Sequence, residues 1–138
     1  NIGNSVGIFT NGTRVLGLGD IGPVASMPVM EGKAVLYDRF VGISATPVLV
    51  AAKDPEEFVD TVERIAPTFG GIHLEDIRMP DCYHIEDELN RRLDKPVRIG
   101  LIADLVGASP RGARRCCGRR TSSSAGTRTP RTSCSSPW

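Results

Sequence analysis

Residues 47–76 read PVLVAAKDPEEFVDTVERIAPTFGGIHLED, and this stretch decides the fold of the chain. It opens on the apolar run 47–51, which is typical of a strand covered on both faces. Residues 54–57 (DPEE) then offer an N-cap, a proline at the first helical position and acidic side chains at the positive end of a helix dipole. A further short apolar run, 72–74, predicts a second strand. Strand, helix and strand in this order predict an α/β fold with a largely parallel sheet.

Two short β-type runs, 6–10 and 13–18, lie upstream of this stretch. They are separated by Asn11-Gly12, and both residue types accept the positive φ angles of a two-residue turn, so we expect a hairpin here. Residues 19–28 form a link rich in glycine and proline. A helical pattern of apolar residues follows over 30–41 and predicts the first helix.

Downstream, a helical pattern begins near Asp81, and residues 96–103 are typical of a further strand. No apolar run approaches the roughly 18 residues of a membrane span, so we expect no membrane insertion and a cytoplasmic protein. The chain opens on Asn1 close to a strand pattern, and we therefore expect that upstream sequence is missing. The four cysteines lack CxxC spacing, which argues against a zinc site or a disulfide framework.

The charge pattern divides the chain into residues 1–97 and 98–138. The first part holds nine Lys/Arg against fifteen Asp/Glu, a formal charge of −6, whereas the second holds eight Arg against one Asp, a charge of +7. Residues 109–138 are mostly Arg, Ser, Thr, Gly and Pro, a composition that cannot bury enough apolar surface to order itself, so we expect a disordered tail. An out-of-frame translation, a rearranged C-terminus and a basic arm that binds nucleic acid are the three open explanations.

Residues 1–97 contain two sets of side chains of the kinds found in reactive sites. Glu75 and Asp76 directly follow a predicted strand, and ligands collect beyond the carboxyl ends of parallel strands, where paired carboxylates suit Mg²⁺ or Mn²⁺. The alternative is a solvated loop pair. Lys33 lies among small and apolar residues in a helix, where desolvation would favour a neutral amine that acts as a base. The alternative is an ordinary surface charge.

The run GLGDIG, residues 17–22, matches the dinucleotide fingerprint G-x-G-x-x-G. Pro23 and Pro28 interrupt the helix that this fingerprint requires, so we interpret the run as a glycine turn that lines a cleft. A small nucleotide-binding protein is the alternative hypothesis. We interpret His73 as a strand residue beside the site and His84 as a helix-face residue, because neither has metal-ligand spacing with a partner.

Three runs taken together resemble the malic enzymes, particularly the shorter prokaryotic type: TNGTRVLGLGDIG at 10–22, PVMEGKAVL at 28–36 and APTFGGIHLEDI at 66–77. The resemblance covers about residues 3–97. It implies an incomplete substrate domain, the N-terminal malate- and metal-binding domain of that family. It also implies the oxidative decarboxylation of malate to pyruvate and CO₂ with NAD or NADP and a divalent metal, Mg²⁺ or Mn²⁺.

The resemblance also implies roles for particular residues. The lysine of the family's Gly-Lys motif, its general base, falls on Lys33, and the metal-binding Glu-Asp pair falls on Glu75 and Asp76. Arg14 stands where the larger members carry a substrate-binding arginine. The family's nucleotide-binding glycines come later than its Gly-Leu-Gly-Asp motif, so no cofactor-binding residue is expected in this chain.

Some of the family's motifs are missing here. The third metal ligand is expected directly after Val97, where residues 98–101 read RIGL instead of the family's Asp-Asp-x-x-Gly-Thr. The family's tyrosine acid belongs to a motif upstream of Asn1, so neither Tyr37 nor Tyr83 takes that role. We therefore expect a fragment that is inactive alone and whose complete form is a homo-oligomer. The alternative is a non-catalytic interaction module with a basic, nucleic-acid-binding tail.

Overall fold

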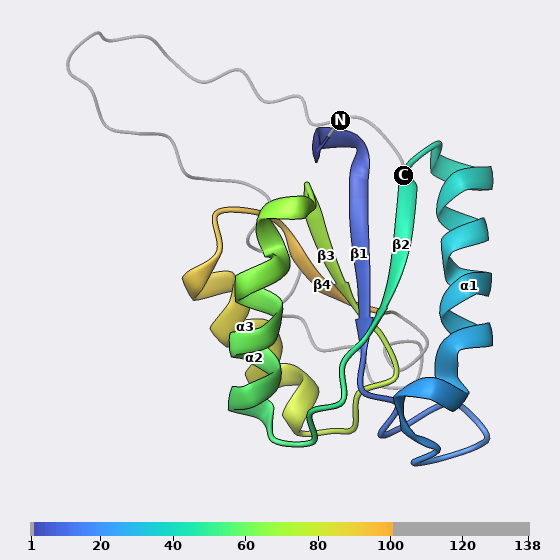
Figure 1. Ribbon diagram of the computed structural model, residues 1–138, viewed down its shortest axis with the longest axis vertical. Helices are drawn as coiled ribbons and strands as arrows, with labels where there is room; N and C mark the ends of the chain where they lie inside the picture. Colours follow the sequence, from blue (N-terminus) through green and yellow to red (C-terminus); the bar gives the residue numbers. More distant parts are fainter. Residues whose placement is uncertain (1, 101–138) are drawn as a thin grey trace, which may run out of the picture. The chain divides into compact units, whose positions relative to one another are not determined.

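A four-stranded parallel sheet forms the centre of the domain. The computed structural model describes residues 2–100. Its strands are β1 (Ser5–Thr10), β2 (Ser44–Leu49), β3 (Gly71–Leu74) and β4 (Val97–Ile99), in the order β2-β1-β3-β4 (Figure 1). Every strand pair is parallel, which confirms the predicted α/β fold with a parallel sheet.

Three helices cover the two faces of this sheet: α1 (Gly22–Val41), α2 (Pro55–Ile65) and α3 (Asp81–Arg92). The step from β1 to β2 runs in one direction across the sheet, and the steps from β2 to β3 and from β3 to β4 run in the other. Right-handed crossovers therefore place α1 on one face and both α2 and α3 on the opposite face. Figure 1 shows this arrangement.

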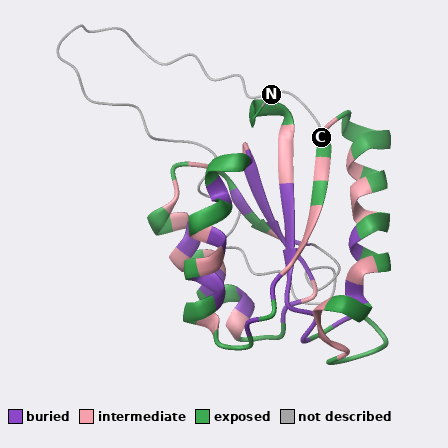
Figure 2. Cartoon of the chain, in the orientation of Figure 1, coloured by how far each residue is buried: buried purple, intermediate pink, exposed green. Residues whose placement is uncertain are grey.

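The larger apolar core lies between the sheet and the α2–α3 pair. Side chains alternate between the faces of a strand, so Ile72 and Leu74 of β3 point to this side, as does Phe9 of β1. The ring of Phe9 packs edge-on against Phe69, with the centroids 5.7 Å apart. Phe58 of α2 is fully buried, which stabilises the fold by about 1.5–3 kcal/mol. Figure 2 shows β1 and β3 as the most buried strands.

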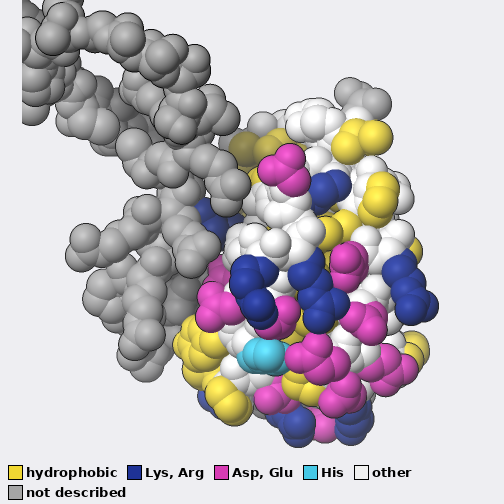
Figure 3. Space-filling model, turned by 90° about the vertical axis from the view of Figure 1, so that its left-hand side faces the viewer, with side chains coloured by type: hydrophobic (Ala, Val, Ile, Leu, Met, Phe, Trp, Pro, Cys, Tyr) yellow, Lys and Arg dark blue, Asp and Glu magenta, His cyan; other side chains and the backbone are white. Residues whose placement is uncertain are grey.

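The local signals for α2 and α3 are confirmed. The Asp54 carboxylate accepts a hydrogen bond from the Glu57 backbone N–H at 3.0 Å, which is the expected N-cap of α2. The outer surfaces of these two helices are charged, and acidic and basic side chains alternate there (Figure 3). Arg92 of α3 contributes to this surface by pairing with Asp60 and Glu63 of α2 at 2.8 and 3.1 Å.

Helix α1 begins eight residues earlier than its apolar pattern predicts, at Gly22, and the expectation that prolines interrupt it is wrong. Pro23 lies in the first turn, where a backbone N–H has no intrahelical partner. Pro28 removes one internal hydrogen bond, whose acceptor would belong to Val24. Val24 is 79% exposed, so water can replace the missing donor at that turn.

The predicted hairpin around Asn11-Gly12 is also wrong. β1 pairs in parallel with β2 and β3, and residues 13–18 form turns closed by a single bridge between Val15 and Gly19. Gly12 does adopt the expected positive φ, at 64°, but this conformation is not part of a hairpin turn. The Gly12 carbonyl accepts hydrogen bonds from the backbone N–H groups of Ile21 and Gly22, which joins the end of β1 to the start of α1.

Strand β2 lies at the sheet edge and is only partly buried, so its apolar run is not covered on both faces as predicted. The strand expected over 96–103 is present as β4, and residues 101–103 lie outside the described part of the chain, as does the basic tail. β4 extends past residue 97, where the charge pattern changes. None of the helices within residues 2–100 combines the length and the apolar content that spanning a membrane requires.

Candidate functional site

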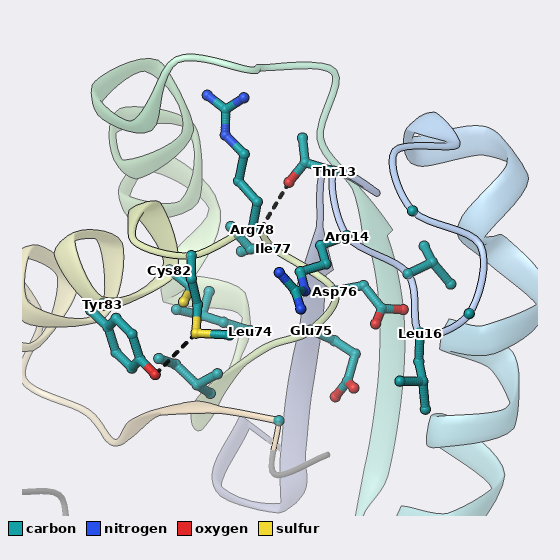
Figure 4. Close-up of a pocket in the computed structure, with 16 residues that line it drawn as sticks. Thr13, Arg14, Leu16, Leu74, Glu75, Asp76, Ile77, Arg78, Cys82 and Tyr83 are labelled. Carbon is teal, nitrogen blue, oxygen red and sulfur yellow. Dashed lines mark hydrogen bonds between the residues drawn. The ribbon is translucent and has the colours of Figure 1, made fainter. Parts of the chain in front are cut away.

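The candidate site lies at the carboxyl edge of the sheet. Glu75 and Asp76 follow β3, the loop after β1 carries Arg14, and Gly100 follows β4, so parallel strands bring all four to one edge. They line a pocket of about 740 Å³. Figure 4 shows Arg14, Glu75 and Asp76 between Leu16, in the loop before α1, and Tyr83 on α3.

The backbone of the Glu75-Asp76 pair is held from both sides. The Glu75 N–H donates to the Phe9 carbonyl of β1 at 2.9 Å, and the Arg14 N–H donates to the Asp76 carbonyl at 3.0 Å. Asp76 adopts a φ of 55°, an uncommon left-handed conformation that aspartate tolerates better than most residues. The turn therefore directs two consecutive carboxylates to the pocket from a fixed backbone.

A buried hydrogen-bonded cluster joins α1 to β3 next to this turn. The Lys33 ammonium lies 3.2 Å from Oε2 of Glu75, and the Nε2 atom of His73 lies 2.6 Å from the same oxygen. The Tyr37 hydroxyl lies 2.9 Å from Nδ1 of His73. The cluster forms because residues four apart share a helix face and residues two apart share a strand face, so both pairs point into the α1–sheet space.

Burial and charge act in opposite directions on the two carboxyls. Burial alone would raise the pKa of the Glu75 carboxyl, but the His73 hydrogen bond and the Lys33 charge outweigh it and hold that pKa below its usual value. Burial and the neighbouring Glu75 charge raise the pKa of the Asp76 carboxyl to about 6, against the effect of Lys33. Burial and the same Glu75 charge raise the pKa of the Tyr37 hydroxyl, which therefore keeps its proton.

This carboxylate pair fits a hard divalent cation. Oδ2 of Asp76 is buried and has no hydrogen-bond partner among the described residues, and leaving such an atom unpaired costs about 1–3 kcal/mol. Lys33 ion-pairs with Glu75, and no ion pair of Asp76 is present within residues 2–100. Mg²⁺ binds proteins through one or two carboxylates and keeps several waters, which this pair allows.

Within residues 2–100, no group of three or more acidic, histidine or cysteine side chains could hold a metal ion. The residue after β4 is Gly100, which packs so closely on the Glu75 carboxylate that any side chain there would collide with it. The candidate oxygen ligands among the described residues are thus the consecutive Glu75 and Asp76, and any further ligands would be water or substrate oxygens.

Of the residues singled out in the sequence, Lys33 contacts Glu75 directly, and Arg14 lines the same pocket as Glu75 and Asp76. Gly17 and Gly19 also line it, which confirms the interpretation of that run as a glycine turn beside a cleft. His84 lies on an exposed helix face and bonds Glu56 at 2.6 Å. The roles of Lys33, Arg14 and the carboxylates stay predictions.

His73 lies in β3 at 2.6 Å from Glu75, as its interpretation as a strand residue beside the site predicts, whereas the contact of Tyr37 with His73 was not predicted. The signal was present as spacing, because Tyr37 is four residues from Lys33 in α1 and His73 is two residues from Glu75 in β3. What the sequence does not contain is that α1 packs on the strand face that carries His73.

Comparisons with known proteins agree over most of the described residues. The family model described as malic enzyme, N-terminal domain, matches residues 3–54 and 51–90. NAD-dependent malic enzyme 1 of Bacillus subtilis (strain 168) is 57% identical over 96 residues, which are 70% of this chain and 22% of that protein. NADP-dependent malic enzyme of Escherichia coli (strain K12) is 50% identical over 95 residues, 69% of this chain and 12% of that protein.

The fold is likewise similar to solved structures. The crystal structure of malic enzyme from Pyrococcus horikoshii Ot3 superposes with a TM-score of 0.70 at 51% sequence identity, over 71% of this chain and 23% of that one. The matching part of the chain thus spans only about a fifth of the length of this structure and of the Bacillus subtilis relative.

Proposed function

The chain belongs to the malic enzyme family, whose N-terminal domain it matches, and we propose that residues 1–97 are the malate- and metal-binding part of such an enzyme. The proposed reaction converts malate and NAD(P)⁺ to pyruvate, CO₂ and NAD(P)H. The observation that supports it best is the contact of 3.2 Å between Lys33 and Glu75, beside the unpaired oxygen of Asp76.

Lys33 is the proposed general base. In its neutral form, the Lys33 amine would take the proton of the C2 hydroxyl of malate while hydride leaves the same carbon for NAD(P)⁺. The Lys33 side chain is only 17% exposed, so most of the water that would compete for its hydrogen bonds is excluded. Its contact with Glu75, a residue that lines the pocket, holds the end of a long, flexible side chain in place.

Arg14 is the proposed substrate-binding residue. It is exposed, and it lines the pocket that Glu75 and Asp76 share. A guanidinium can bind a carboxylate through two parallel hydrogen bonds, so Arg14 would hold one carboxylate of malate at the pocket. Its backbone N–H is bonded to Asp76, which couples the position of the arginine to that of the carboxylate pair.

Glu75 and Asp76 are the proposed ligands of Mg²⁺ or Mn²⁺. When bound, the metal supplies a Lewis acid for the C2 oxygen and its neighbouring carboxylate, and NAD or NADP supplies the hydride acceptor. The carboxylates of this chain would replace waters of the ion and place its charge beside Lys33. We propose that NAD(P) is held by a part of the enzyme other than this chain, in a cytoplasmic homo-oligomer.

Titration of the purified 138-residue chain with Mn²⁺, followed by electron paramagnetic resonance of the free ion, tests the metal site. We expect saturable binding that is lost when Glu75→Gln and Asp76→Asn are combined. The matched control combines Glu56→Gln with Asp60→Asn, two exposed carboxylates on α2, and should bind Mn²⁺ as the native chain does. Equal binding by both double variants would refute the assignment.

We also propose that the chain alone does not catalyse the reaction. Purified chain mixed with malate, Mn²⁺ and either NAD or NADP is expected to give no reduced nicotinamide by absorbance. This expectation is supported by the match to only about a fifth of the length of a relative, and by the lack, within residues 2–100, of any group of three or more side chains that could hold a metal ion. Steady turnover that Lys33→Met abolishes would show instead that the chain is catalytically sufficient.

A further inference from the structure

We propose that Tyr37 and His73 are positioning residues that fix the Glu75 carboxylate for metal binding, a role that rests on the proposed function. The geometry behind this proposal is a continuous chain of contacts. Tyr37 touches His73 at 2.9 Å, and His73 touches Glu75 at 2.6 Å. The Glu75 side chain is 4% exposed, so these protein groups and Lys33 take the place of water around it.

The donor and acceptor of each of these hydrogen bonds can be assigned by starting from the Glu75 carboxylate. An ionised carboxylate can only accept, so Nε2 of His73 must carry the hydrogen that Glu75 receives. In a neutral imidazole the other nitrogen is then an acceptor, and the Tyr37 hydroxyl donates to it. Tyr37 therefore selects the one tautomer of His73 that can hold Glu75.

The same chain restricts how the Glu75 side chain can turn. His73 and Lys33 approach a single oxygen, Oε2, from a strand and from a helix. The Tyr37 and His73 rings meet edge-on, with their centroids 5.6 Å apart, so the imidazole is held by packing as well as by its hydrogen bonds. Partners that orient a metal-binding carboxylate contribute to metal affinity although they never touch the ion.

A purely structural role of Tyr37 and His73 predicts a different result for metal binding. If Tyr37 and His73 only satisfied each other in a buried space, their loss would lower stability and leave the Mn²⁺ affinity of the folded chain unchanged. Metal affinity, measured on chains shown to be folded by circular dichroism, separates the two explanations.

We expect His73→Leu to weaken Mn²⁺ binding by the chain about tenfold, the lower end of the range for such partners. His73→Gln should restore binding to within about threefold of native, because the glutamine amide can donate to Glu75 in place of Nε2. His84→Leu, at an exposed histidine that also bonds a glutamate, is the matched control and should leave affinity unchanged.

Tyr37→Phe tests the second link. Alone it should weaken Mn²⁺ binding by about threefold or more, and combined with His73→Leu it should add nothing, because Tyr37 acts only through His73. Long-range ¹⁵N–¹H spectra should show His73 protonated at Nε2 in the native chain and a mixture of tautomers in Tyr37→Phe.

The outcomes also separate this proposal from the proposed function. Absence of Mn²⁺ binding by the native chain, or binding that survives Glu75→Gln with Asp76→Asn, would overturn the metal site and this proposal with it. Native-like affinity in folded His73→Leu, with binding still dependent on Glu75 and Asp76, would overturn only the positioning role. Additive losses in the Tyr37→Phe/His73→Leu pair would overturn the order of the chain.

Discussion

Among single residues in the described part of the chain, Asp76 combines several unfavourable features. Its φ is 55°, one of its oxygens is buried without a partner, and Glu75 lies next to it. Burial and the Glu75 charge raise the pKa of its carboxyl to about 6, so the folded chain binds this proton more tightly than the unfolded chain does. This contribution favours folding below the unfolded pKa of about 3.9 and is lost as the pH rises through about 6.

Asp76→Asn should therefore remove the part of the pH dependence of the free energy of unfolding that comes from this carboxyl. Measured by urea unfolding in the presence of a chelator, the variant should gain about 1 kcal/mol over the native chain between about pH 4.5 and about pH 7.5, a figure discounted because the side chain is half-buried. The Glu75 carboxyl, whose pKa is lowered, stays ionised in the folded chain over this pH range and so adds little to the difference. A stability difference that is the same at both pH values would contradict the raised pKa.

Gly12 illustrates a residue whose conformation and surroundings both exclude a side chain. Its φ is 64°, and a Cβ atom would collide with the backbone carbonyl of Gly22. Gly12→Ala should lower the free energy of unfolding by about 2 kcal/mol or more, because both the strain and the collision must be relieved. Gly17→Ala is the matched control, since Gly17 has a similar φ of 78° but open space around it, and it should cost less in the same urea experiment.

At the scale of one element, the N-terminus of α2 is capped by the side chain of Asp54. Asp54→Ala removes the acceptor of the Glu57 N–H and should lower the free energy of unfolding by about 1 kcal/mol. Asp54→Asn keeps an accepting oxygen and should cost only a fraction of that. Chemical denaturation of the two variants in parallel checks the prediction, and equal losses would mean that the charge rather than the cap is what matters.

Helix α1 has two apolar faces, and only one of them is packed within residues 2–100. Met30 is fully buried against the sheet, on the face that also carries Lys33 and Tyr37, whereas Phe40 is 81% exposed. Further apolar side chains of α1 are exposed: Val24, Val29, Val35 and Leu36. The polar cluster thus lies on the packed face, while several apolar side chains of the helix face outward.

This difference in exposure predicts a large effect of one substitution in α1 and almost no effect of another. Met30→Ala should lower the free energy of unfolding by about 2–5 kcal/mol, because it leaves a cavity between α1 and the sheet. Phe40→Ser should change it by less than about 0.5 kcal/mol, because the ring is already in water. Thermal unfolding followed by circular dichroism measures both, and comparable losses would place Phe40 in a packed environment.

For the whole molecule, the question is which residues the folded unit needs. Within residues 2–100, the last strand of the sheet is β4, and it is needed because it pairs with β3. The proposed division therefore separates an acidic, folded part from a basic tail whose composition carries few apolar residues. A deletion that tests it must begin after β4.

Removal of residues 108–138 should leave the urea midpoint and the Mn²⁺ affinity of the chain unchanged. Any salt-sensitive binding to DNA or RNA should disappear with these residues, because the positive charge lies mainly there. Nucleic-acid binding that persists after the deletion would contradict the basic-arm explanation, and a large loss of stability would contradict the proposed division into two parts.

Much of the fold could be predicted because its signals are local. The Asp54 cap, the proline after it and the apolar spacing of α3 each act within one turn of helix. The prediction of a hairpin was wrong because Asn11-Gly12 favours a turn but does not determine which strands pair with each other. β1 instead gains two parallel neighbours, β2 and β3, from residues more than thirty positions away.

By itself, the sequence determined that the domain is α/β, that Glu75 and Asp76 follow a strand, and that Lys33 lies in a helix, because periodicity and capping depend on neighbours in the chain. Only the tertiary structure decided that α1 covers the strand face carrying His73 and Glu75. Tyr37 and Lys33 meet these residues across 36 and 42 positions. Such contacts depend on which face of the sheet a crossover helix covers. The spacing of residues within one helix or strand does not determine that face.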